Sequence, residues 1–128
     1  MNFRLFALFA TFCLIILSVP TPVPAAAAPT IIPLWPEGVP NLRADASPEK
    51  IDEEQRVSNI HEPSLTFFPA PTDRATGTAV IICPGGGYMR LSIAKEGTEI
   101  AEWFNARGVT AFVLRSRLVE YGQPAPLQ

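Results

Sequence analysis

The sequence predicts an α/β fold built on a strand, a glycine-rich loop, a helix and a second strand. Residues 78–83 (TAVIIC) and 109–114 (VTAFVL) are continuous apolar runs rich in β-branched residues, a composition typical of parallel strands covered on both faces. Apolar residues at helical spacing lie between them. Parallel strands need a crossover of about a dozen residues or more, so we expect these two runs to pair in one sheet.

The N-terminal residues 1–28 have the composition of a secretory signal peptide. Arg4 is followed by an uncharged apolar run of 15 residues at positions 5–19 and then by a segment rich in Pro and Ala. A membrane span needs about 20 residues, so a cleaved signal is favoured over an uncleaved anchor or a buried helix. We expect cleavage after one of the alanines at 26–28, export to the periplasm or the exterior, and no stable membrane insertion afterwards.

A leading arm rich in proline and charge is expected over residues 29–56. Pro33, Pro36 and Pro40 block a helix over residues 31–41 and permit at most an edge strand, because proline cannot donate to a strand ladder. Residues 41–56 are rich in charge and predict a solvated loop or a short helix.

A pair of strands is predicted next, followed by the crossover unit. Residues 57–60 and 65–68 favour extended structure, and residues 69–77 (PAPTDRATG) are dense in turn formers. These elements precede the apolar run at 78–83.

The helix of the crossover unit is predicted from a stripe of small and apolar residues. Ile93, Gly97, Ile100 and Phe104 lie at positions i, i+4, i+7 and i+11, and Gly108 supplies a stop signal. The stripe is expected to pack on the sheet.

Composition excludes several function classes. The chain has 10 Lys and Arg against 12 Asp and Glu, a net charge of -2, so no basic surface is predicted for nucleic acid. His61 is the single histidine, and we interpret it as a turn or surface residue because one His-Glu pair does not make a metal site. No metal or cofactor is expected. Cys83 is the one cysteine outside the predicted signal peptide, so no internal disulfide is predicted for the mature chain.

The glycine loop after residues 78–83 is the candidate functional site. Pro84-Gly85-Gly86-Gly87-Tyr88 follows a predicted parallel strand at its carboxyl end, where open α/β sheets bind ligands. Glycine backbone can direct N–H groups into one cavity, to hold a phosphate or to stabilise an oxyanion. A Walker loop and a dinucleotide motif are both absent from the sequence, which favours the oxyanion over a phosphate, with a purely structural turn as the other alternative.

Several motifs together resemble the start of the α/β-hydrolase esterases, notably the secreted acetyl-xylan-esterase-like group. They are Cys83-Pro84-Gly85-Gly86-Gly87-Tyr88, Lys95-Glu96-Gly97, Trp103-Phe104-Asn105, Gly108-Val109, Ala111-Phe112-Val113-Leu114 and PLWPEG at residues 33–38. The resemblance implies that Gly86 and Gly87 are the oxyanion donors and that Pro84, Gly85 and Tyr88 shape the loop. Pro84 stands where the better-known form of this loop has histidine.

The same resemblance implies acyl transfer by a serine, aided by an Asp or Glu and a His. No G-x-S-x-G motif occurs in the 128 residues, and the single histidine precedes the glycine loop. Residues 57–128 are therefore expected to be the N-terminal part of a truncated α/β-hydrolase domain with an incomplete sheet. This chain alone is expected to be inactive and, because an apolar edge strand is left open, poorly soluble.

We therefore predict a fragment of an exported serine ester hydrolase that acts on a small-molecule or polysaccharide ester, such as an acylated carbohydrate. The alternatives are a non-catalytic binding module, an inactive truncated product, or a lipase or peptidase on the same fold.

Overall fold

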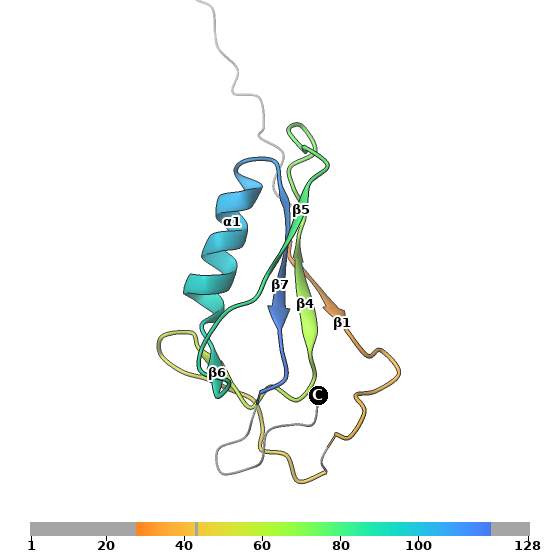
Figure 1. Ribbon diagram of the computed structural model, residues 1–128, viewed down its shortest axis with the longest axis vertical. Coiled ribbons are helices and arrows are strands. Elements are labelled where there is room, and N and C mark those ends of the chain that lie inside the picture. Colours follow the sequence, from red (N-terminus) through yellow and green to blue (C-terminus); the bar gives the residue numbers. More distant parts are fainter. Residues whose placement is uncertain (1–27, 43, 119–128) are drawn as a thin grey trace, which may run out of the picture.

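The computed structural model describes residues 28–42 and 44–118. The predicted signal peptide lies outside the described residues apart from Ala28, and so does the tail from residue 119. Figure 1 shows a main sheet with a helix along one face, and a small strand, β6, beyond the N-terminal end of that helix. In the described ranges no helix is long and apolar enough to cross a membrane.

The main sheet is mixed, with strand order β1-β4-β7-β5. Its strands are β1 (Thr30–Pro33), β4 (Ser64–Phe68), β7 (Thr110–Arg115) and β5 (Ala79–Ile82). β5 and β7 pair in parallel, which confirms the pairing expected of the two apolar runs. β1 and β4 add antiparallel strands on the other side of β7, and β1 is at the sheet edge, where proline is tolerated.

A second, smaller sheet has the order β2-β3-β6 and is antiparallel throughout. Its strands are β2 (Lys50–Ile51), β3 (Val57–Ser58) and β6 (Arg90–Leu91). The prediction of a loop or short helix at 41–56 is therefore wrong for β2. Val57 and Leu91 are buried here with Ile60 and Leu118, and this separate apolar cluster holds the small sheet in place.

The predicted strand pair is also wrong as a pair, because β3 and β4 belong to different sheets. Pro63 is buried between them, and Asn59 has a positive φ of 57°, so the chain turns between the two strands. β4 pairs over its whole length with β7, whose six residues offer a longer partner than the two-residue β3.

The helical segment confirms the predicted helix but shifts its buried stripe. A π-helical turn (Ile93–Thr98) leads into α1 (Glu99–Asn105). Ile100 was expected on the sheet face, yet it is 41% exposed, whereas Ala101 is fully buried. A π turn holds an extra residue, which rotates every later position by about 100° relative to an uninterrupted α-helix. Gly97, which lies within the π turn, is buried as predicted.

One face of the main sheet is covered by this helical segment and the other is open in the described ranges. The covered side forms a core of Phe68, Ala101, Ala111 and Val113, with Val80, Ile82, Ile93 and Phe104 packed against it. On the opposite face Phe67 and Phe112 stack with ring centroids 5.1 Å apart, and Ile81 beside Phe112 is 65% exposed. The prediction that both faces of β5 are covered is therefore wrong for this part of the chain.

Replacing Ile81 with lysine is expected to reduce self-association of the chain. β5 is at the sheet edge and carries no charge, and an uncharged apolar edge strand pairs readily with another copy. A lysine there places a charge on the open face with a cost to stability below about 1 kcal/mol, because the side chain is largely exposed. Sedimentation velocity across a concentration series measures the effect.

Ile100→Lys is the matched control, since Ile100 is also exposed but lies on the helix away from the strand edge. An equal fall in self-association for both variants would show that the added charge alone is the cause, and not protection of β5.

Candidate functional site

The glycine loop connects β5 to β6 and depends on backbone conformations that favour glycine. Gly86 has φ 149° and Gly87 φ 66°, and Tyr88 continues with φ 62°. A Cβ at Gly86 would lie 1.9 Å from the carbonyl oxygen of Arg90, so the chain passes too close there for any side chain. Gly86 is therefore required by the loop's own packing.

The start of the loop is fixed by contacts with the helical segment. The Gly85 N–H donates to Oε2 of Glu96 at 2.8 Å, and the Gly85 carbonyl accepts from the Ser92 N–H at 3.0 Å. Pro84 is buried, and a Cβ built on Gly97 would lie 3.3 Å from its Cγ. These contacts fix the first residues of the loop against the helical segment. Tyr88 is 81% exposed, so it makes little packing contact.

The next two amides of the loop have no acceptor in the described part of the chain. Neither the Gly86 nor the Gly87 N–H donates to a residue within 28–42 or 44–118, in contrast to Gly85, whose N–H is held by Glu96. Unpaired backbone N–H groups beside a cavity are the donors that bind an anion or a developing negative charge.

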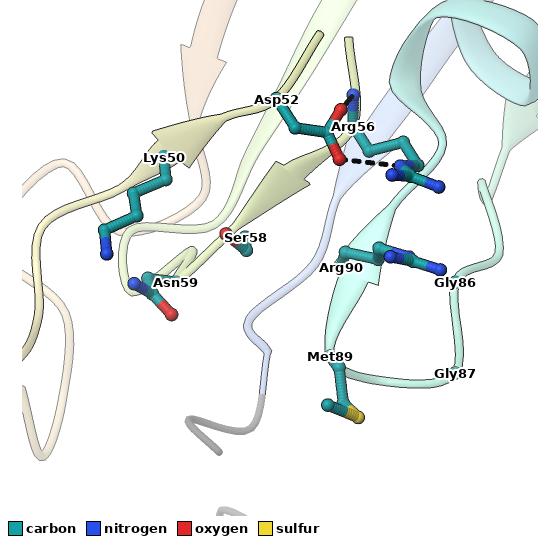
Figure 2. A pocket seen from close by; sticks show the side chains of 9 residues that line it. All are labelled: Lys50, Asp52, Arg56, Ser58, Asn59, Gly86, Gly87, Met89 and Arg90. Atoms are coloured by element: carbon teal, nitrogen blue, oxygen red, sulfur yellow. Dashed lines mark hydrogen bonds and ion pairs between the residues drawn. The ribbon is translucent and has the colours of Figure 1, made fainter. Parts of the chain in front are cut away.

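Gly86 and Gly87 border a pocket of about 670 Å³ that lies against the small sheet. Its other lining residues are Lys50, Asp52, Arg56, Ser58, Asn59, Met89 and Arg90. Figure 2 shows the Arg90 side chain extending toward Gly86, with Arg56 on the same side of the pocket and Lys50 beside Asn59 on the other. Three cationic side chains and one carboxylate therefore line the pocket together with the two glycines.

Arg56 is held by the turn that joins β2 to β3. The Asp52 carboxylate accepts from the backbone N–H groups of Glu54 at 3.1 Å and Arg56 at 2.9 Å. Its second oxygen accepts from Nε of Arg56 at 2.7 Å, and Glu54 pairs with the same guanidinium. The hydrogen bond from the Arg56 backbone, above all, lowers the pKa of Asp52, while the bond from the Arg56 side chain to Asp52 raises the pKa of the guanidinium.

This turn is expected to weaken in acid. Because the folded-state pKa of Asp52 is lowered, its stabilising contribution is present above the unfolded pKa of about 3.9 and is lost as pH falls through the lower, folded value. Asp52→Asn should therefore lower the melting temperature at pH 6, with the difference from wild type shrinking below pH about 3.9. Thermal unfolding of wild type and Asp52→Asn, followed by circular dichroism at pH 6 and at a pH below about 3.9, measures the two differences in melting temperature.

Asp73→Asn is the control, because Asp73 pairs only loosely with Arg74, at 3.7 Å between exposed groups. A difference between wild type and Asp52→Asn that stayed constant with pH would contradict the assignment to Asp52 ionisation.

The remaining candidate groups have structural places. His61 is half-buried and its Nε2 makes a 2.9 Å hydrogen bond with the Ser47 carbonyl oxygen, so it ties two loop segments together. Cys83 is a free, exposed cysteine. In the described ranges no group of three or more His, Cys, Asp or Glu side chains is placed to hold a metal ion.

Comparison with known proteins gives one relative with a described activity. No protein-family model matches the sequence. Over 63 residues the chain is 34% identical to a protein of Xylanibacter ruminicola described as an acetylxylan esterase. The matched segment is 49% of this chain and 12% of that relative, so the chain spans only a small part of the relative's length. The match supports a relationship to esterases over about half of the chain.

The basic residues of the pocket were not predicted from the sequence. Lys50 and Asp52 flank Ile51, and Arg56 and Ser58 flank Val57, so polar residues alternate with apolar ones in both short strands. That period-two alternation is the signal that could have placed the polar residues on one outward face.

Proposed function

We propose that this chain supplies the oxyanion-binding loop of an exported serine esterase that acts on acylated carbohydrate. The observation that carries the proposal is the pair of unpaired amides, Gly86 and Gly87, beside a pocket of about 670 Å³ after a strand paired in parallel. The 34% identity to an acetylxylan esterase supports an ester as the substrate.

The chemistry assigned to the loop is stabilisation of charge. When a serine oxygen attacks the ester carbonyl, the C=O bond becomes a C–O⁻, and the Gly86 and Gly87 N–H groups would donate to that oxygen. Removing one such donor costs about 10²–10³ in kcat in enzymes of this kind. Gly85 takes no part because its N–H already donates a hydrogen bond to the Glu96 carboxylate, and Pro84 keeps the loop anchored on the helical segment.

The nucleophile and its partners are proposed to lie in a part of the protein beyond these 128 residues. None of the serines here is in a G-x-S-x-G frame. His61 is engaged with Ser47, and it precedes the glycine loop in the sequence. We accordingly propose that the isolated chain has no hydrolytic turnover.

The coding DNA tests this division of the active site. Sequencing past the codon for Gln128 is expected to show a continuing frame with G-x-S-x-G, followed by an Asp or Glu and then a His. A stop codon directly after Gln128, together with a stable product that binds a ligand without hydrolysing it, would favour a non-catalytic binding module.

Export is proposed from residues 1–28. Expression of the chain in a secreting bacterium, followed by N-terminal sequencing of the exported product, should give a start within three residues of Pro29. A product that retains Met1 in the membrane fraction would indicate an uncleaved anchor.

A further inference from the structure

The small sheet places polar residues from three strands in one row on its outward face. Lys50 pairs with Ser58 across β2 and β3, and Ser58 pairs with Arg90 across β3 and β6. The neighbouring pair Val57 and Leu91 is buried on the inward face. Because side chains alternate along a strand, Lys50, Ser58 and Arg90 share the face that borders the pocket.

Two of the pocket's cations have no counter-ion in the described residues. Arg56 is paired with Asp52 and Glu54, which offset its charge. Neither Arg90 nor Lys50 makes an ion pair or a side-chain hydrogen bond within the described ranges. The free positive charge of the pocket therefore belongs to Arg90 beside Gly86 and to Lys50 at the opposite side (Figure 2).

We propose that this pocket binds the carboxylate of an acidic sugar, so that the substrate is an acylated oligosaccharide bearing a uronate. The inference rests on the proposed function of the glycine loop and specifies its substrate class. Arg90 is the primary contact, because a guanidinium can hold a carboxylate through two parallel N–H bonds. Lys50 adds a second positive charge on β2, whose backbone lies two strand spacings, about 10 Å, from that of β6.

The composition of the pocket favours a sugar carboxylate over other anions. Ser58 lies between the two cations and offers a hydroxyl, and Asn59 beside Lys50 offers its amide oxygen, since its amide nitrogen donates to the Pro48 carbonyl oxygen at 3.0 Å. Both groups are suited to sugar hydroxyls. Two free cations are too few to track a nucleic-acid backbone, and the net charge of the chain is -2. The position of Arg90 next to Gly86 lets one substrate present its ester to the loop and its carboxylate to the arginine.

Calorimetric titration of the chain with matched oligosaccharides tests the proposal. The probes are a xylo-oligosaccharide, the same oligosaccharide with one glucuronate branch, its carboxyl-reduced form, and inorganic phosphate. We expect the glucuronate form to bind about tenfold more tightly than the two neutral forms at low salt, with the preference falling as salt is raised. Phosphate should bind more weakly than the glucuronate form, because it makes no sugar contacts.

Arg90→Gln should abolish the preference for the acidic sugar, and Lys50→Gln should reduce it by a smaller factor. Arg74→Gln removes the same charge from the exposed loop before β5 and should preserve the preference. Far-UV circular dichroism tests whether each variant keeps its fold. If Arg90→Gln does not fold, the preference of Lys50→Gln for the acidic sugar is the test, and an unchanged preference overturns the proposal. Equal binding of acidic and neutral oligosaccharides, phosphate binding as tight as the acidic sugar, or an unchanged preference in a folded Arg90→Gln variant would each overturn the proposal.

These results separate the inference from the function on which it rests. Selective binding of the acidic sugar with no G-x-S-x-G in the coding frame would support the pocket and refute the esterase. A complete esterase whose binding ignores the carboxylate would support the function and refute the pocket.

Discussion

Gly86→Ala is expected to destabilise the chain by about 3 kcal/mol and to disrupt the glycine loop. The added Cβ would lie 1.9 Å from the Arg90 carbonyl oxygen and 2.7 Å from its carbonyl carbon, and neither backbone atom can move without shifting β6. The φ of 149° is itself unfavourable for any side chain. Because Arg90 would move with the loop, the pocket should lose its shape as well.

Gly87→Ala is the matched control within the same loop. Its φ of 66° lies in the left-handed region, but a Cβ there would meet nothing within 4 Å. The expected cost is about 1 kcal/mol, which reflects conformation alone. Urea unfolding of both variants in an Ile81→Lys background, where association is suppressed, measures the difference. Equal stabilities for the two variants would contradict the close approach of Gly86 to Arg90.

Gly108→Ala is expected to lower the free energy of unfolding by about 3 kcal/mol or more, because the added Cβ would push the turn after α1 away from the loop before β5. Gly108 is buried with φ 75°, and a Cβ would lie 2.0 Å from the Arg74 carbonyl oxygen. The Gly108 carbonyl also accepts hydrogen bonds from the Thr76 N–H at 2.8 Å and the Thr76 hydroxyl at 3.0 Å. Displacing this turn should loosen the pairing of β5 with β7 just beyond it.

Gly77→Ala isolates the steric part of this effect. Gly77 has nearly the same φ, 79°, yet a Cβ there would meet nothing within 4 Å. Its expected cost is about 1 kcal/mol. Thermal unfolding combined with amide hydrogen exchange in β5 measures both variants. If Gly77→Ala proved as damaging as Gly108→Ala, the contact with Arg74 would not be the cause.

The crossover unit could be predicted because its signals are local and strong. The apolar runs at β5 and β7 are long and rich in β-branched residues, and Gly108 marks the end of the helical segment. The buried stripe could not be placed correctly, since nothing in the sequence shows that Ile93–Thr98 forms a π turn. That turn moves the buried position from Ile100 to Ala101.

The small sheet and its pocket could not be predicted because their strands are only two residues long. Lys50, Ser58 and Arg90 are far apart in the sequence and meet only through strand pairing. The apolar cluster that holds them combines Val57, Leu91 and Leu118, and no local pattern connects these residues. The glycine loop was identifiable from its composition, whereas the charges that surround it depend on tertiary structure.

Acetate release from acetylated xylan tests most directly whether Gly86 and Gly87 belong to an esterase active site. The assay compares residues 29–128 with the longer protein that the proposed function expects the coding frame to encode, and with that protein after Ser→Ala replacement in the expected G-x-S-x-G motif. We expect release only from the longer protein, and loss of release in the serine variant. Release by residues 29–128 alone that survives repurification, or a longer protein with no such motif and no release, would contradict the assignment.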